Sequence, residues 1–129
     1  MKIIFISYSF KNGGAAIAAA KFAQIASILS DIKVITQAES GVPHFLKRLI
    51  SFMLSKTQYD FNPVKHSLNL FSYTPVLNAF HRYKDCLFHV HWINNDTLSV
   101  FDLDVIPSGT IITLHDEWLY CGAEHCYKI

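Results

Sequence analysis

Three adjacent residues near the end of the chain have side chains that can transfer protons or bind a ligand. His115, Asp116 and Glu117 come directly after the apolar run 110–114. A histidine in this position can donate a hydrogen bond to a substrate hydroxyl or phosphate, and Asp116 could orient its ring. Because ligands bind at the carboxyl ends of strands in parallel sheets, we predict that these residues point into a binding crevice. A strand end that is merely capped by polar residues is the alternative.

A second polar segment, residues 89–96, contains His89, His91 and Asn94. Alternation along a strand puts the two histidines on the same face. A His-x-His pair can ligate zinc, but a complete site needs further ligands. Histidines that pack in the core or form hydrogen bonds explain the pair without a metal, and we expect none here.

The turn Asn12-Gly13-Gly14 separates an apolar run from an alanine-rich segment. Glycine permits a positive φ and a close backbone approach, and a helix start offers free N–H groups at the positive end of its dipole. A phosphate or sugar oxygen would fit such a turn, and a tight turn without a ligand fits it equally well. The dinucleotide pattern G-x-G-x-x-G is absent, which disfavours a nicotinamide-dependent dehydrogenase.

The three cysteines, Cys86, Cys121 and Cys126, are an odd number, which is typical of reduced thiols in a cytoplasmic protein. Cys121, His125 and Cys126 offer zinc ligands, but the Cys-x4-Cys spacing is atypical and the chain has no Cys-x-x-Cys. No cysteine has a sequence context that would activate it as a nucleophile. We expect neither a metal nor a cofactor.

Alternating strands and helices must position these residues. The apolar run 2–7 predicts a buried strand, the alanine-rich segment 14–30 a helix, and the β-branched run 32–36 a second strand. This order predicts a βαβ unit with a parallel sheet. A proline can begin a helix over residues 43–56, and its apolar stripe would contain Phe45, Leu46, Leu49, Ile50 and Met53.

The second half of the chain continues the α/β pattern. Residues 58–75 are expected to be irregular, with a short helix at 76–83, a strong strand at 86–93, a short helix at 96–101 and a buried strand at 110–114. We therefore predict one α/β domain over residues 1–129, with a Rossmann-like parallel sheet flanked by helices.

Composition excludes several classes of protein. A chain of 129 residues that is 51% hydrophobic can fold without disulfides or metal. Its 11 basic and 10 acidic residues nearly cancel, so there is no overall charge for binding nucleic acid. The first apolar run ends at Ser7, which argues against a signal peptide, and no run approaches the roughly 20 residues that span a bilayer. The mean hydropathy of +0.24 predicts an apolar face that a partner covers.

Three blocks together resemble the amino-terminal domain of family 4 glycosyltransferases, in the bacterial branch that builds colanic acid and related surface polysaccharides. They are Gly-Gly-Ala-Ala at 13–16, His-Val-His-Trp-Ile-Asn at 89–94, and Thr-Leu-His-Asp-Glu-Trp at 113–118. The stretch 122–125 is also similar to that branch, whereas residues 43–83 match it poorly.

This resemblance implies the amino-terminal half of a GT-B fold, from a retaining, nucleotide-sugar-dependent hexosyltransferase that is usually metal-independent. Gly13 and Gly14 would face the diphosphate or sugar of the donor, and His115 would approach the transferred sugar. Asp116 would share the catalytic role, and the same cleft would be lined by His91, Asn94 and Glu117. The partners implied are a nucleotide sugar and a glycan or lipid-linked acceptor.

One departure from the family is large. Its second Rossmann domain, with a Glu-x7-Glu motif and basic residues that stabilise the leaving diphosphate, does not follow Ile129. We therefore expect that the chain alone does not complete sugar transfer, and that a chain with such a carboxy-terminal domain is a partner. A non-catalytic α/β module that binds a glycan or nucleotide, and an inactive relic, are the alternatives.

The helix expected at 43–56 also bears on localisation. Its apolar stripe is accompanied by Lys47, Arg48 and Lys56, so it could rest on an anionic membrane surface such as the inner membrane. Packing of the same stripe against the sheet is the alternative.

Overall fold

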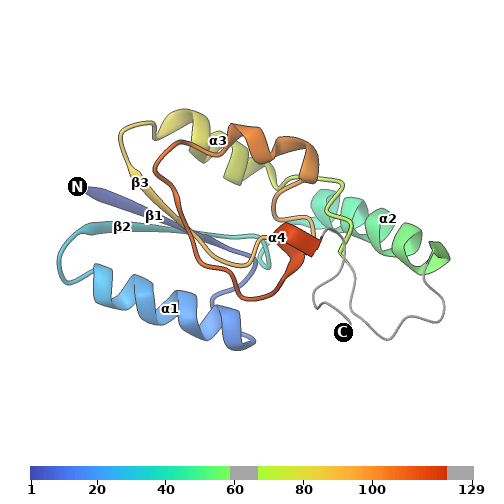
Figure 1. The fold of residues 1–129 in the computed structure, drawn as a ribbon, viewed down its shortest axis with the longest axis horizontal. Helices are drawn as coiled ribbons and strands as arrows, with labels where there is room; N and C mark the ends of the chain where they lie inside the picture. Colours follow the sequence, from blue (N-terminus) through green and yellow to red (C-terminus); the bar gives the residue numbers. More distant parts are fainter. Residues whose placement is uncertain (59–66, 122–129) are drawn as a thin grey trace.

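A four-stranded parallel sheet with helices on both faces forms the centre of the computed structural model, which describes residues 1–58 and 67–121 (Figure 1). The strands, in the spatial order β2-β1-β3-β4, are β1 (Lys2–Ser7), β2 (Asp31–Thr36), β3 (Leu87–Val90) and β4 (Ile111–Ile112). The helices are α1 (Gly14–Ala26), α2 (Val42–Gln58), α3 (Thr74–Arg82), the 3-10 helix η1 (Val100–Val105) and α4 (Trp118–Cys121). The prediction of a Rossmann-like α/β fold is confirmed.

The layers follow from alternation along the strands. Helix α1 covers one face of the sheet, and α3 with η1 covers the other (Figure 1). On the α3 side, Ile4 and Ile6 of β1 and Phe88 and Val90 of β3 are buried against Val76, Ala79 and Phe80. Such alternating, β-branched and aromatic side chains stabilise the sheet by burying apolar surface on a helix.

Helix α1 lies on the sheet through small side chains. Ala16, Ala19 and Ala23 are its buried residues, at spacings of three and four, beneath Phe5 of the sheet. The helix ends at Ala26 and not at residue 30 as predicted. The hydroxyl of Ser27 donates to the carbonyl of Gln24 at 2.7 Å, a local bond that competes with helix continuation.

Two predictions for the second half were wrong. The short helix expected at 96–101 is instead η1, because the Ser99 hydroxyl caps its start by accepting from the N–H of Phe101 at 3.1 Å. The strand expected to be buried over 110–114 is β4, with only two residues, Ile111 and Ile112, both exposed. It lies at an edge of the sheet and is hydrogen-bonded to β3.

Helices α2 and α4 lie beyond the carboxyl ends of the strands (Figure 1). The alternative in which the apolar stripe of α2 packs against the sheet is wrong, because Phe45, Leu46, Leu49, Ile50 and Met53 are all exposed. Helix α3 begins two residues earlier than predicted, with a proline in its first turn. Within residues 1–58 and 67–121, no helix is long and apolar enough to cross a bilayer.

Candidate functional site

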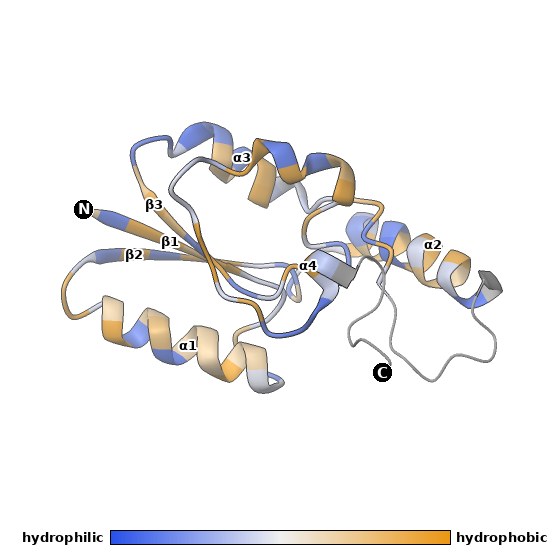
Figure 2. Cartoon of the chain, viewed as in Figure 1, coloured by the Kyte–Doolittle hydropathy of each residue, from blue (hydrophilic) through white to orange (hydrophobic). Residues whose placement is uncertain are grey.

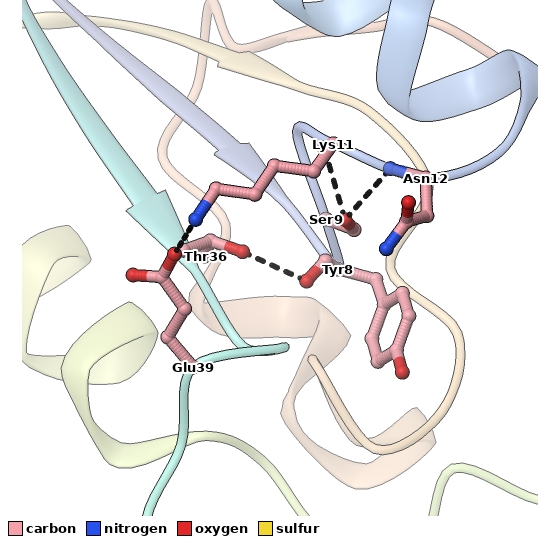
Figure 3. Close-up of polar contacts among 6 residues, drawn as sticks. All are labelled: Tyr8, Ser9, Lys11, Asn12, Thr36 and Glu39. Carbon is pink, nitrogen blue, oxygen red and sulfur yellow. Dashed lines mark hydrogen bonds and ion pairs between the residues drawn. The ribbon is translucent and has the colours of Figure 1, made fainter.

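The turn between β1 and α1 is shaped by side chains (Figure 3). The hydroxyl of Ser9 accepts from the backbone N–H groups of Lys11, at 3.1 Å, and Asn12, at 3.4 Å. Thr36 at the end of β2 donates to the carbonyl of Tyr8 at 2.9 Å, which ties the turn to the neighbouring strand. These bonds hold the backbone that leads into the glycine pair.

Gly13 has φ 95° and ψ 162°, a conformation that is essentially restricted to glycine. It precedes the first residue of α1, and no side chain caps the helix start. The first turn contains no acidic residue either. The free N–H groups and the positive end of the helix dipole therefore face the surroundings of this turn, an arrangement that favours an anion.

A pocket of about 330 Å³ lies in front of this helix start. Ser7, the last residue of β1, lines the pocket and is only 1% exposed. Its hydroxyl has no hydrogen-bond partner among the described residues. Leaving a buried hydroxyl unpaired costs about 1–3 kcal/mol, so the Ser7 hydroxyl favours a partner in this pocket, which a water or a ligand can supply.

The glycine pair leaves this pocket open. A Cβ atom built on Gly13 or Gly14 would meet no heavy atom within 4 Å. A ligand can therefore approach the backbone of both residues closely. The other walls are formed by residues of the connection between β1 and α1, by Asn95 and by Trp92. The Trp92 ring meets the Tyr8 ring edge-on, with 5.5 Å between centroids.

His91 and His115 form a hydrogen-bonded pair. The Nδ1 atom of His91 and the Nε2 atom of His115 are 3.0 Å apart, so one ring nitrogen donates to the other. His89, two residues earlier in β3, lies beside His91, with 4.3 Å between the two ring centroids. The Nε2 atom of His89 contacts the Thr113 hydroxyl at 2.8 Å. Phe22 of α1 packs on the rings of His89 and His91.

Burial keeps this histidine cluster uncharged at neutral pH. Burial, together with the neighbouring His89 and His115, lowers the pKa of His91 to about 4. Burial also lowers the pKa of His89 and that of His115, although the Asp116 carboxylate partly opposes the shift at His115. A neutral His115 can accept or donate a hydrogen bond. His115 is half-buried, and its Nδ1 atom has no hydrogen-bond partner among the described residues.

Asp116 belongs to a different set of bonds from His115. One carboxylate oxygen accepts from the indole N–H of Trp92 and from the amide of Asn94, the latter at 3.0 Å. The other accepts from the backbone N–H of Trp118 at 3.2 Å, at the start of α4. Asp116 thus fixes the Trp92 ring, while the ring of His115 is held by His91.

The parallel sheet brings the predicted residues to one edge. The glycine pair follows the carboxyl end of β1, His91 that of β3 and His115 that of β4. Trp92 lines both the glycine pocket and the narrow space beside His115. That narrow space measures about 10 Å³, which is close to the volume that a single water needs.

His91 and Asn94 are buried beneath the surface at the carboxyl ends of the strands, since each is only 1% exposed. They can act on a ligand through His115 and Asp116, whose side chains they contact. Glu117 is half-buried and stands just before α4, where its carbonyl accepts from the N–H of Tyr120.

Sequence reasoning missed Ser7, Trp92 and Thr113 as site residues. Ser7 ends the first strand immediately before the glycine turn, and this position is the only signal that could have found it. The contact of Thr113 with His89 depends on the register between β3 and β4, in which His89 is paired with Ile111.

Within the described ranges, no group of three or more His, Cys, Asp or Glu side chains is arranged to hold a metal ion. Of the candidate zinc ligands in the segment Cys121 to Cys126, His125 and Cys126 lie outside those ranges.

Scans against protein-family models, curated proteins and solved structures find no match to this chain. Its function is therefore inferred from the geometry of this edge and from the resemblance in sequence.

Proposed function

We propose that the chain is a domain that binds a phosphorylated ligand at the start of α1. The observation that carries this proposal is the buried, unpartnered Ser7 hydroxyl in the same pocket as the uncapped helix start and the glycine pair. A phosphate would accept from the helix N–H groups and from Ser7 and would interact favourably with the helix dipole.

More particularly, the domain is the acceptor-side, amino-terminal half of a retaining glycosyltransferase that uses a nucleotide sugar and acts on a glycan or lipid-linked acceptor in surface-polysaccharide synthesis. The resemblance of the three sequence blocks supports this proposal, as does the parallel α/β fold. We place the reaction in the cytoplasm, at the inner membrane. It needs no metal or other cofactor.

Within this proposal, each side chain is assigned a role that its contacts support. Gly13 and Gly14 give the donor diphosphate access to the backbone, and Ser7 donates to it. His115 forms a hydrogen bond to a sugar hydroxyl or stabilises positive charge near the anomeric carbon through its Nδ1 atom. His91 orients His115, and Asp116 with Asn94 holds Trp92 as the wall between the two ligand groups.

A second candidate function is binding without turnover. Among the described residues, no lysine or arginine lines the glycine pocket. A leaving diphosphate needs compensating positive charge, so this observation favours a module that holds a nucleotide or glycan.

Calorimetric titration with uridine diphosphate tests the phosphate site. We expect saturable binding that Ser7→Ala weakens roughly tenfold or more, because a hydrogen bond to a charged group is lost. Gly14→Ala should also weaken binding, since its methyl group fills open space in front of the helix.

Ser27→Ala is the matched control, because this exposed hydroxyl bonds only within its own turn after α1. Its binding should equal that of the unchanged chain. If uridine diphosphate fails to bind, or if Ser7→Ala binds it as tightly as the unchanged chain, the phosphate site is refuted.

A further inference from the structure

Helix α2 contacts the rest of the molecule through its polar side. The ring of His44 bonds the carbonyl of Asp96 at 2.9 Å, and the hydroxyl of Ser51 donates to the Asp96 carboxylate at 2.8 Å. Arg48, between them, donates to the Tyr8 hydroxyl at 3.3 Å. The three residues are spaced by four and three positions and so lie on one face of the helix. Helices on globular proteins normally turn their apolar face inward, and α2 does the opposite.

The apolar side of α2 faces outward. Eight large apolar side chains of this helix are each between 41% and 71% exposed, namely Val42, Phe45, Leu46, Leu49, Ile50, Phe52, Met53 and Leu54. Figure 2 shows these hydrophobic segments on a helix at the outside of the fold. An exposed apolar surface of this kind marks a site of interaction.

The charges on α2 indicate what covers that surface. The helix contains Lys47, Arg48 and Lys56 and no acidic residue, although the whole chain carries a net charge of only +1. Lys47 and Lys56 are both exposed. A helix with a broad apolar face and exposed lysines is complementary to an anionic lipid surface.

Lys56 distinguishes a bilayer from a protein partner. It continues the row formed by Phe45, Leu49 and Phe52, at spacings of four, three and four, and its ammonium lies 5.6 Å from the centre of the Phe52 ring. A dry protein interface on this row would bury the ammonium group at a large cost unless the partner supplied an acidic side chain. At a bilayer the same side chain extends to the lipid phosphates while its neighbours enter the acyl region.

We propose that α2 lies in the surface of an anionic membrane, with its axis along the surface and its outward apolar side chains among the lipids. The polar face, fastened to Asp96 and Tyr8, then orients the carboxyl edge of the sheet relative to the membrane. This proposal does not rest on the proposed transfer reaction, and each can fail without the other.

Flotation of the full chain with lipid vesicles tests the proposal. We expect the chain to float with vesicles of phosphatidylcholine containing about one-third phosphatidylglycerol, to float poorly with phosphatidylcholine alone, and to be released by added salt. The pair Leu46→Gln and Met53→Gln should lower partition roughly tenfold or more. Lys47→Gln and Lys56→Gln should each lower it roughly fivefold.

The pair Ile28→Gln and Leu29→Gln is the matched control. These side chains are 79% and 86% exposed in the turn after α1, away from α2. Vesicle partition of this control should equal that of the unchanged chain. All substituted residues are exposed, so each variant should keep the thermal unfolding midpoint of the unchanged chain.

Three results would overturn the proposal. The first is an unchanged chain that stays unbound with anionic vesicles. The second is equal loss of binding in the control pair at Ile28 and Leu29. The third is sedimentation velocity that shows a dimer broken by the Leu46 and Met53 substitutions in a chain that binds no vesicles, because a second copy of the chain would then cover α2.

Discussion

At the scale of single residues, the most constrained side chain in the site is His91. It is 1% exposed, its Nδ1 is paired with His115, and its Nε2 has no partner among the described residues. Protonation would place a charge in this buried position. Burial of that charge is unfavourable, which lowers the pKa of His91 to about 4. The difference between this pKa and that of the unfolded chain makes the stability of the fold depend on pH.

Lowering the pH should therefore destabilise the protein. The unfolded chain binds a proton at His91 near pH 6.5, whereas the folded chain binds it only near pH 4, so stability falls as the pH drops between these values. The full loss from this residue is about 3 kcal/mol. Urea unfolding of the unchanged chain and of His91→Phe, measured from pH 7 to pH 5, should show a smaller slope for the variant.

Asp96 acts in the opposite sense, because burial raises its pKa. Its contribution is common to both proteins and cancels when their slopes are compared. Parallel pH profiles for the unchanged chain and His91→Phe would contradict the assignment of a buried, neutral His91.

At the scale of elements, the two neighbouring glycines at the start of α1 differ in backbone conformation, because only Gly13 has a positive φ. Gly13→Ala should lower the free energy of unfolding by roughly 1–3 kcal/mol, because φ 95° with ψ 162° strains any residue that has a side chain. Gly14→Ala should leave stability unchanged or raise it by up to about 1 kcal/mol, since its Cβ meets nothing and alanine favours the helix. Urea unfolding of both variants checks this difference.

Equal losses at the two positions would show that the turn does not have the geometry described. A Gly14→Ala variant that is stable but binds uridine diphosphate poorly would separate the role of this residue in binding from its role in folding.

Local sequence signals predicted the elements that depend on local interactions. The apolar run of β1, the alanines of α1 and the β-branched residues of β2 each favour one structure regardless of their surroundings. The length of β4 could not be predicted, because an edge strand ends where its pairing with β3 ends. The orientation of α2 was equally inaccessible, since it is set by Asp96, which is 45 residues away from Ser51.

The candidate site divides in the same way. Gly13, Gly14 and His115 follow predicted strands, so their position at the carboxyl edge of the sheet could be inferred. The bond between His91 and His115, and the bond between Asp116 and Trp92, join residues 24 positions apart in sequence. Such pairs depend on the register between β3 and β4, and the pattern of apolar residues along the sequence does not reveal that register.

At the scale of the whole molecule, the proposed anion site lacks cationic side chains among the described residues. The pocket contains helix N–H groups, two serines and two glycines, and none of its lining residues is a lysine or arginine. Lys11, near this turn, pairs with Glu39 at 2.7 Å. The charge that develops on a departing diphosphate is therefore only partly compensated.

The chain on its own should consequently bind a nucleotide sugar without turning it over. Release of uridine diphosphate from a uridine diphosphate sugar, in the presence of a glycan acceptor, should stay at the spontaneous rate. A transferase active on the same donor serves as the positive control. Turnover by the purified chain at rates of roughly 1 per second or more, which are ordinary for enzymes, would refute this expectation.

The two sides of α2 are under different evolutionary constraints, because only the polar side forms side-chain hydrogen bonds to the rest of the described structure. Ser51 donates to the side-chain carboxylate of Asp96, so a change at either position leaves the other without this bond. His44 bonds the backbone carbonyl of Asp96, which every residue type at position 96 retains. The eight apolar positions on the outward side are each between 41% and 71% exposed. If the proposed membrane contact holds, these positions can exchange one apolar residue for another, or gain and lose lysines, and so change the strength of that contact without changing the bonds of the polar face.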